Sequence, residues 1–414
     1  MATLHPTRRV LALMPSYVQK FACIGSECED TCCAGWTVAI DKKTYKAYRH
    51  APKTSLSGRL PAAVKRLSDS VSAANFGYID LVPETGACPL LEQQLCAVHS
   101  QLGEEHLSHN CFSYPRKWLH ADGVMLQTLT LSCPQAARLA LLADDAFEMV
   151  ESEITVRPSA VGQLLPQHGL SVEQMNEVRF LCVQIIRTEG LDLWQKLAVV
   201  GVFCDSLTQA LNAGQQASIA EICNTTRDYI VSGQVLGLCD SIVAHADLQA
   251  LTFNLLWRFG KTIHMRPTHR AVFAAIEAGL SIGAAAGEAK EDALIARYQS
   301  GLALLPQALA KAPAFLDNYV LNEMLRDTFP FGAECTRPNE HYLRLVTRFG
   351  LLRFMLAVQC IPDTALPELA DMVSTVQVFA RRFQHDSEFA NKVNNCFHEA
   401  GLESLGKIFI LLKP

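Results

Sequence analysis

The spacing of apolar residues divides the chain into two parts of different character. In the second part, Met175, Val178, Leu181, Cys182 and Ile185 recur three or four positions apart in most steps, so they fall on one face of a helix. Similar stripes follow, separated by Gly, Pro and Asn, over 191–212, 216–231, 240–259, 269–280, 290–310, 314–328, 340–360 and 364–384. No fixed repeat length relates these stripes. The pattern predicts an irregular all-α domain of packed antiparallel helices.

The first third of the chain has short apolar runs between turn residues. Short strands are predicted over three of these runs, 36–40, 76–82 and 124–131. Asp41 can cap a helix that continues through Tyr48, and a second short helix is expected over 62–67. A third helix is predicted over 134–142, directly after Cys133. Its positive end would therefore face whatever Cys133 binds.

Length and breaker residues predict the domain organisation. A chain of 414 residues exceeds one ordinary hydrophobic core, which favours two domains. Proline and glycine residues interrupt any long helix over 151–171, so this stretch is predicted to be a linker. We expect a mainly α protein, with a small cysteine-rich α+β domain of short strands over 1–150 and a larger irregular all-α helical domain over 172–414.

Composition and charge narrow the class of protein. Half of the residues are apolar and 19% are charged, as in an ordinary globular protein. The formal net charge of −5 argues against a nucleic-acid binder, which carries a concentrated basic face. The apolar run Val10–Met14 is too short for a signal-peptide core, and no transmembrane segment of about 20 apolar residues is found. We expect a cytoplasmic protein, compatible with peripheral membrane contact, whose oligomeric state stays open.

Cysteines are the residues that most strongly indicate chemistry. Eight of the 15 lie in the first third among turn residues: Cys23, Cys28, Cys32, Cys33, Cys88, Cys96, Cys111 and Cys133. In a reducing cytosol, clustered thiols are more often metal ligands than disulfides. Thiolates suit an iron–sulfur cluster or a zinc ion, and the residues alone leave both open. Eight thiols exceed the need of one site, so either some do not ligate or there are two metal centres. The cysteines of the helical stripes are expected to fill the core.

The motifs around these cysteines resemble two known groups of proteins. The first group is the zinc- or iron-chelating cysteine-rich domains, whose elements match at Cys32–Cys33, Cys88-Pro89-Leu90-Leu91, Cys96, and Cys111 with Tyr114-Pro115. Over most of its length the chain also resembles the flagellin lysine-N-methylase family. That resemblance lies in MPSYVQKFACIGSECEDTCCAGWTV, LQTLTLSCPQAARLALL, DNYVLNEMLRDTFPF and RRFQHDSEFA.

The family resemblance implies an S-adenosylmethionine-dependent methyltransferase that N-methylates lysine side chains of flagellin and carries a 4Fe-4S cluster. It puts iron–sulfur ahead of zinc, which remains the alternative metal. All eight N-terminal cysteines become ligand candidates. The inner four are taken to be Cys33, Cys88, Cys96 and Cys111, because the CC, CPLL and C-x-x-Y-P elements recur together in the smaller cysteine-rich domains. Donor and flagellin are expected to bind the helical domain.

Two better-known patterns for the methyl donor are not matched. A dinucleotide-type fold would place a glycine-rich turn after a strand, whereas Gly279, Gly283 and Gly287 lie in an alanine-rich stretch interpreted as a helix–loop junction. A radical S-adenosylmethionine enzyme would show C-x3-C-x2-C, but the cysteine that follows Cys32 is the adjacent Cys33. The cluster is therefore not presented in that motif, and a structural role for it stays open.

Methyl transfer to lysine requires a deprotonated amine, a site that tolerates a sulfonium cation, and alignment of acceptor and methyl. Acidic and aromatic groups suit both cations. Asp317 and Tyr319 are the catalytic candidates, with Glu323 and Tyr342 as further ones. The competing interpretation of Tyr319 is an aromatic side chain of the helical core.

Binding of the donor needs partners for its polar groups. Asn318 lies at the family's late NY motif, and Arg381, Arg382 and His385 form a basic stretch that could hold the donor carboxylate. A solvated helix face is the competing interpretation of that stretch. His99 could serve as a fifth ligand or support a ligand, or be an ordinary surface histidine.

Two other classes of function stay open. In one, the helical domain binds flagellin or another secretion substrate, and the metal site only braces the fold. In the other, the chain is a redox-active iron–sulfur protein whose cluster cycles between oxidation states. The first would bind its partner without consuming the donor, and the second would change its visible absorbance reversibly without transferring methyl groups.

Overall fold

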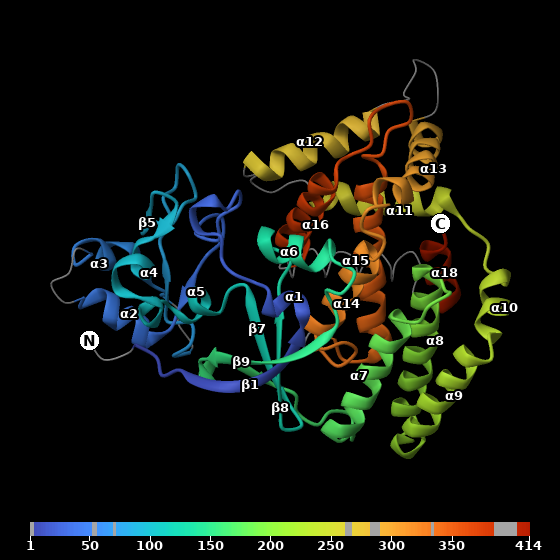
Figure 1. The fold of residues 1–414 in the computed structure, drawn as a ribbon, viewed down its shortest axis with the longest axis horizontal. Helices are drawn as coiled ribbons and strands as arrows, with labels where there is room; N and C mark the ends of the chain where they lie inside the picture. Colours follow the sequence, from blue (N-terminus) through green and yellow to red (C-terminus); the bar gives the residue numbers. More distant parts are fainter. Residues whose placement is uncertain are drawn as a thin grey trace. The chain divides into compact units, whose positions relative to one another are not determined.

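The computed structural model describes residues 4–51, 56–68, 72–260, 267–281, 290–332, 335–384 and 404–414. The chain forms two compact units (Figure 1). The N-terminal unit comprises Met1–Ala136 and Met149–Gln163, and the helical unit comprises Ala137–Glu148 and Leu164–Pro414. The predicted fold class is confirmed, because small sheets occur in the first unit and the second is helical.

A five-stranded sheet organises the N-terminal unit, in the order β10-β7-β8-β1-β9. Its strands are β1 (Arg8–Pro15), β7 (Arg116–Ala121), β8 (Val124–Leu129), β9 (Met149–Val156) and β10 (Val161–Gln163). β7 and β8 form an antiparallel hairpin closed by Asp122 and Gly123. Both of these residues have positive φ, which is the backbone conformation that an Asp-Gly turn provides. The predicted strand over 124–131 is therefore confirmed.

Within the stretch 151–171, predicted as a linker, the residues up to Gln163 contribute β9 and β10 to this sheet. β9 pairs antiparallel with β1 along its whole length, from Arg8 opposite Val156 to Pro15 opposite Met149. Pro158, Gly162 and the later breakers end helices but permit short strands. The alternation of Val150, Ser152 and Ile154 with exposed glutamates is a strand pattern that outweighs them. The chain passes from one compact unit to the other after Ala136, Glu148 and Gln163, whereas the predicted boundaries were 150 and 172.

Smaller sheets and short helices complete the N-terminal unit. Its remaining strands are β2 (Ala39–Ile40), β3 (Val64–Arg66), β4 (Gly77–Ile79), β5 (Leu91–Glu92) and β6 (Leu95–Cys96). Its helices are α1 (Ser16–Gln19), α2 (Lys42–Arg49), α3 (Arg59–Ala63), α4 (Ala97–Leu102) and α5 (His109–Ser113), and α6 (Pro134–Leu141) follows Cys133. Asp41 caps α2 as predicted. The helix expected over 62–67 ends at Ala63, because the chain then pairs with β4 as β3.

The helical unit contains α7 (Val172–Ile186), α8 (Leu193–Asn212), α9 (Ile219–Val231), α10 (Gln234–Ser241), α11 (Ala246–Gly260), α12 (Pro267–Ser281), α13 (Lys290–Ala308), α14 (Phe315–Arg326), α15 (Pro338–Ala357), α16 (Leu369–Phe383) and α18 (Leu405–Leu412). The apolar stripes thus predict these helices closely. No helix among the described residues is long and apolar enough to cross a membrane.

Helix α15 is the core of the helical unit, since nearly all of its residues are buried. Glycines let its neighbours approach closely. A Cβ on Gly201 of α8 would lie 2.6 Å from the Tyr342 ring, and one on Gly350 would lie 2.1 Å from the Phe253 ring of α11. Larger residues at either glycine would force these helices apart.

Candidate functional site

The four cysteines predicted as inner ligands pack around one hydrophobic cluster of the N-terminal unit. Cys88 is buried within that cluster, and Cys33, Cys96 and Cys111 pack against it. They come from separate elements: Cys96 ends β6, Cys111 lies in α5, and the backbone N–H of Cys88 donates to the Cys33 carbonyl at 2.7 Å. The fold therefore gathers thiols that are far apart in sequence.

Several of the N-terminal sulfurs accept hydrogen bonds from backbone N–H groups two or three residues ahead. Cys88 accepts from Leu90, Cys96 from Val98 and His99 at the start of α4, and Cys28 from Asp30. Cys133 accepts from Gln135 and Ala136 in the first turn of α6, so the positive end of that helix faces the Cys133 sulfur. Donors aimed at sulfur stabilise the thiolate, which is the form that binds metals.

Burial acts in the opposite direction on the same thiols. It raises the pKa of Cys88 to about 11 and the pKa of Cys111 to about 12. Hydrogen bonds that the Cys33 thiol donates to Cys32 and to Cys96 raise the pKa of Cys33, and the bond received from Cys33 lowers the pKa of Cys96 to about 6. The Cys96 thiolate is thus favoured even without a bound metal. Several thiolates together require a positive charge among them, which a metal centre supplies.

The other four candidate ligands lie toward the edge of this group. Cys23 and Cys32 are exposed, and Cys28 and Cys133 are half-buried. Burial raises the pKa of Cys133 to about 12, with the Cys28 and Cys32 thiols acting in the same direction. The Cys32 thiol also acts to raise the pKa of Cys88 and of Cys111, so it lies near the inner thiols as well.

The spacing of the thiols is wider than a single ion needs. In tetrahedral zinc sites with Zn–S bonds of about 2.3 Å, the sulfurs lie about 3.8 Å apart. In the part of the chain that the structure describes, the one set of three or more candidate ligand atoms within 4.8 Å of one another is His5, Asp41 and His109. Among the described residues the thiols therefore do not form a preassembled tetrahedral zinc site.

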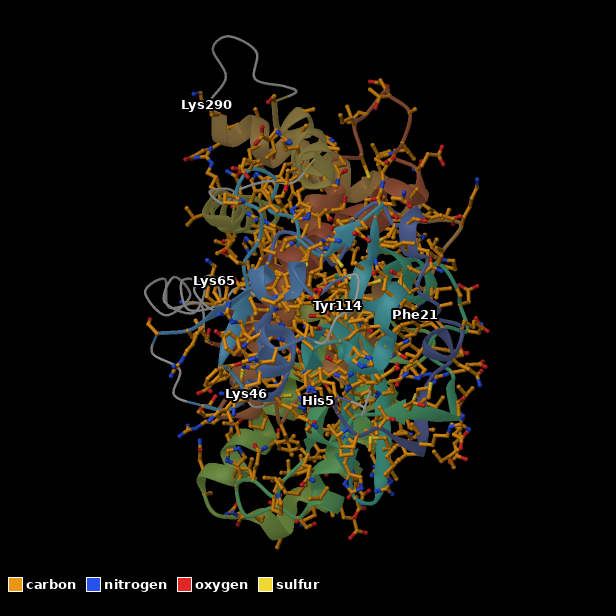
Figure 2. All side chains as sticks on the ribbon, turned by 90° about the vertical axis from the view of Figure 1, so that its left-hand side faces the viewer. His5, Phe21, Lys46, Lys65, Tyr114 and Lys290 are labelled. Carbon is orange, nitrogen blue, oxygen red and sulfur yellow. The ribbon has the colours of Figure 1, made fainter. Side chains whose placement is uncertain are left out.

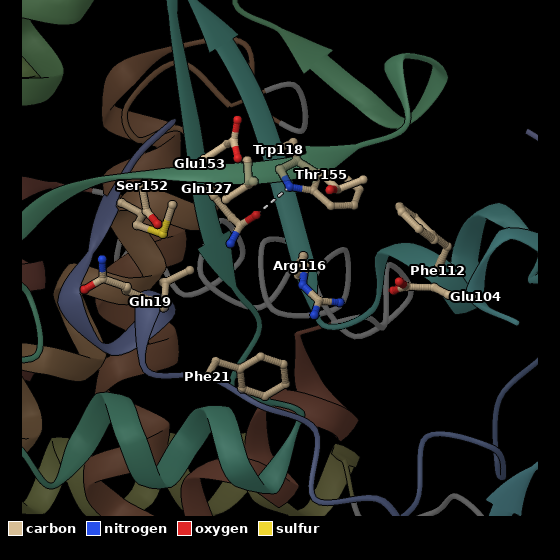
Figure 3. Close-up of a pocket in the computed structure, with 13 residues that line it drawn as sticks. Gln19, Phe21, Glu104, Phe112, Arg116, Trp118, Gln127, Ser152, Glu153 and Thr155 are labelled. Carbon is tan, nitrogen blue, oxygen red and sulfur yellow. Dashed lines mark hydrogen bonds between the residues drawn. The ribbon is translucent and has the colours of Figure 1, made fainter. Parts of the chain in front are cut away.

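A cavity of about 250 Å³ opens beside these elements within the N-terminal unit (Figure 3). Its lining includes three aromatic side chains, two carboxylates and one arginine: Phe21, Phe112, Trp118, Glu104, Glu153 and Arg116. The Trp118 Nε1–H donates to Gln127 at 2.7 Å, which fixes the indole. In Figure 3, Arg116 lies between Phe21 on one side and Phe112 and Glu104 on the other. Two of these rings already face a guanidinium of the protein, with Arg116 over Phe21 at 5.6 Å and Arg157 over Phe112 at 4.0 Å, so the lining suits cations.

The predicted catalytic residues Asp317 and Tyr319 lie in α14, outside that cavity. The Lys196 Nζ donates to Asp317 at 2.6 Å, and Asn318 donates to the Ala143 carbonyl at 2.9 Å. Tyr319 is fully buried, and its ring packs edge-on to Phe379. These contacts are those of a helix docked into its own unit.

Glu323 and Tyr342, the further candidates, are buried as well. Glu323 belongs to an ionic network in which Arg326 donates to it at 3.1 Å and to Asp327 at 3.0 Å. Arg348 approaches Asp327 at 2.9 Å. Burial disfavours the Arg326 charge, but the Asp327 and Glu323 carboxylates outweigh it and raise the pKa of Arg326. All of these residues belong to the helical unit, so the network forms within that unit.

The residues predicted to hold the donor are placed only in part. Arg381 and Arg382 are half-buried in the last turn of α16, and neither lines the cavity. His385 lies outside the described residues. His99 is exposed near the end of α4. Arg381 and Arg382 thus belong to the helical unit, and the thiols belong to the N-terminal unit.

The residues of the cavity give little signal in the sequence. Phe21, Glu104, Arg116 and Glu153 come from four separate segments, and no local spacing relates them. A partial signal exists at Phe112 and Trp118, because aromatic residues flank the Cys111 motif on its C-terminal side. Phe112 and Trp118 pack against each other with ring centroids 6.0 Å apart.

Comparison with known proteins identifies a family domain within the helical unit. The model of the FliB lysine N-methylase C-terminal domain matches residues 179–411, more than half of the chain. Lysine-N-methylase of Salmonella typhimurium (strain LT2) is 24% identical over 92% of this chain and 94% of its own length, and that of Salmonella choleraesuis (strain SC-B67) is equally similar. Flagellar biosynthetic protein FliU of Salmonella muenchen is 32% identical over 37% of this chain and 89% of its own length. No solved structure matches the chain. The chain belongs to the FliB lysine N-methylase family.

Proposed function

We propose that this protein transfers methyl groups from S-adenosylmethionine to lysine side chains of flagellin and carries a 4Fe-4S cluster. The observation that carries the proposal is the family match over 179–411, together with relatives named lysine-N-methylase that align along nearly the whole chain. The flagellar name of a third relative supports flagellin as the partner. Alignment outside the family domain means that the N-terminal unit shares in the resemblance.

The cluster is proposed at Cys33, Cys88, Cys96 and Cys111. Support comes from their convergence on one hydrophobic cluster and from the N–H donors aimed at Cys88 and Cys96. When bound, a 4Fe-4S cluster supplies one-electron chemistry and a rigid cross-link between the segments that hold it. Cys28, Cys32 and Cys133 are close enough to support it or to form a second centre.

The cavity beside Trp118 is proposed to hold the acceptor lysine. In methyl transfer the amine lone pair forms a bond to the methyl carbon, the carbon–sulfur bond breaks, and the donor leaves as a neutral thioether. The nitrogen then loses a proton. Glu104 and Glu153 can attract the lysine ammonium and take up protons, and the aromatic rings tolerate its charge.

The decisive experiment incubates the cluster-loaded full chain with S-adenosylmethionine and flagellin under anaerobic conditions. We expect whole methyl increments on flagellin lysines by mass spectrometry, with a matching amount of S-adenosylhomocysteine. Glu104→Gln should lower the rate at least tenfold, whereas Glu151→Gln, an exposed glutamate of β9 that does not line the cavity, should not.

Other outcomes would favour the rival functions. If flagellin is retained by the protein while the donor is not consumed, the chain is a binding module. If the visible spectrum cycles with a reductant while no methyl is transferred, it is a redox protein. An equal loss of rate in Glu104→Gln and Glu151→Gln would refute the assignment of the cavity alone.

A further inference from the structure

A second polar group lies in the N-terminal unit, apart from the cysteines. It consists of His5, Asp41 and His109, brought together from the segment before β1, the N-cap of α2 and the first residue of α5. Figure 2 labels His5. His5 is 5% exposed, and the side chains of Asp41 and His109 are 12% and 26% exposed. Only a small part of this group therefore reaches the surface.

The two imidazoles converge on one carboxylate oxygen. The His5 Nε2 is 3.3 Å from the Asp41 Oδ2, and the His109 Nε2 is 4.0 Å from the same atom. The ring centroids of the two histidines are 3.9 Å apart. Side chains from three separate segments thus point their ligand atoms at one place.

Asp41 caps α2 through its Oδ1, and its Oδ2 is the oxygen that lies near the histidines. Its Oδ1 accepts from the backbone N–H groups of Lys43 and Thr44, at 2.8 and 3.0 Å. Its Oδ2 accepts from the Thr44 hydroxyl at 2.5 Å, and that hydroxyl is 2.9 Å from the His5 Nε2. The carboxylate is therefore held in one orientation by its own helix, as preorganised metal ligands are.

We propose that His5, Asp41 and His109 bind one divalent first-row transition ion, at a site separate from the cysteine cluster. Two imidazoles and one carboxylate form the ligand set that such ions favour, and three protein ligands leave positions open for water or a substrate oxygen. With metal–ligand bonds of about 2.1 Å, ligand atoms lie about 3 to 3.5 Å apart. The 3.3 Å separation already meets this, and His109 needs to move by less than an ångström.

The surrounding charges limit the affinity. Arg157 and Lys43 are the cations that act on His5, and Asp41 is the one carboxylate of the group. A bound divalent ion would therefore leave net positive charge, so we expect micromolar rather than nanomolar binding. The competing arrangement is a hydrogen-bonded cluster in which each Nε2 carries a proton and donates to Asp41. The two arrangements differ in whether these nitrogens offer a lone pair.

Titration of the cluster-loaded full chain with Mn²⁺ after removal of loose metal by a chelator tests the proposal, because Mn²⁺ prefers nitrogen and oxygen ligands over thiolates. The electron paramagnetic resonance signal of free Mn²⁺ should fall to a 1:1 endpoint. Asp41→Asn and His109→Gln should each weaken binding at least tenfold, and His120→Gln, an exposed histidine of β7, should leave it unchanged.

Asp41→Asn is the sharpest variant because asparagine caps helices as well as aspartate does. Loss of binding with an unchanged melting temperature would support a ligand role, and His5→Gln provides a second variant that can keep the bond to Thr44. Equal binding in the wild type, Asp41→Asn and His109→Gln, or no binding at millimolar Mn²⁺, would overturn the proposal. Iron and sulfide content should not change in any variant, so failure here is distinct from failure of the cysteine site.

Discussion

The two units use the same residue, cysteine, in opposite ways. In the helical unit Cys182, Cys204, Cys223, Cys239 and Cys360 are buried among apolar side chains, which confirms that they fill the core. There the thiols donate hydrogen bonds to neutral acceptors: Cys360 to the Leu356 carbonyl, and Cys204 to the Cys182 sulfur. Cys335 is half-buried, and Cys396 lies outside the described residues.

In the N-terminal unit the sulfurs act mainly as acceptors. Backbone N–H groups point at Cys88, Cys96 and Cys133, which lie in turns or directly before helices. A thiol that donates to a carbonyl is stable as a neutral group, whereas a sulfur that accepts from N–H groups is prepared for negative charge. Cys88, Cys96 and Cys133 thus differ from the core cysteines in the direction of their hydrogen bonds, whereas Cys33 donates to Cys96 as a neutral thiol does.

Replacing one cysteine by serine in each unit tests most directly whether the cysteines of the two units have different roles. Cys111→Ser should abolish the iron–sulfur absorbance and the acid-labile sulfide, because it removes one of four proposed ligands. Cys204→Ser should leave both unchanged, although it lowers stability by about 1–2 kcal/mol through a buried hydroxyl. Anaerobic absorption spectra with iron and sulfide analysis measure both. A sulfide content insensitive to Cys111→Ser would contradict the assignment.

The helical unit holds charge by internal pairing, and removing one partner should be costly. Arg326→Met removes a buried arginine that pairs with both Glu323 and Asp327, which we expect to destabilise the protein by about 3–5 kcal/mol. Arg227→Met, which breaks the exposed pair with Glu177, should cost less than about 1 kcal/mol. Chemical denaturation monitored by circular dichroism compares the two. Equal effects would show that the Arg326 network is solvated.

A smaller effect is expected from pH. Burial lowers the pKa of His341 from 6.5 to about 4, and the Gly332 N–H donates to its Nδ1. Between these values the unfolded chain binds more protons than the folded one, so stability is fully present above pH 6.5 and is lost as pH falls. The loss between pH 7 and pH 5 should be about 2 kcal/mol.

His341→Asn keeps an acceptor for Gly332 and should flatten this acid limb, while the exposed His120→Asn should not. Denaturation curves at the two pH values give the slope directly. A loss of stability with acid that is the same in both variants would assign the effect to other groups.

The sequence predicts most of the helical unit, because the stripe at Met175–Ile185 and its successors express a local period of 3.6 residues. It also predicts which cysteines share a hydrophobic cluster, since Cys33, Cys88, Cys96 and Cys111 carry recognisable motifs. The pairing of β1 with β9 joins residues about 140 positions apart, and no local pattern encodes such a partner.

The other candidate sites could not be predicted either, because each is assembled from residues that are far apart in the sequence. The cavity draws on Phe21, Arg116 and Glu153, and the histidine group draws on His5, which has no motif around it. The prediction of donor and acceptor binding on α14 and α16 relied on residue type without knowledge of burial. Tyr319 illustrates the problem, because an aromatic residue suited to a cation is equally suited to a core.

The single turn of α5 contributes to three places at once: His109 to the histidine group, Cys111 to the thiols, and Phe112 to the cavity wall. A helix of five residues is too short to persist without tertiary support. Its position therefore depends on what each of its faces contacts. Occupancy of one site then alters the affinity of the others by a shared factor, and thermodynamic reciprocity makes that influence equal in both directions.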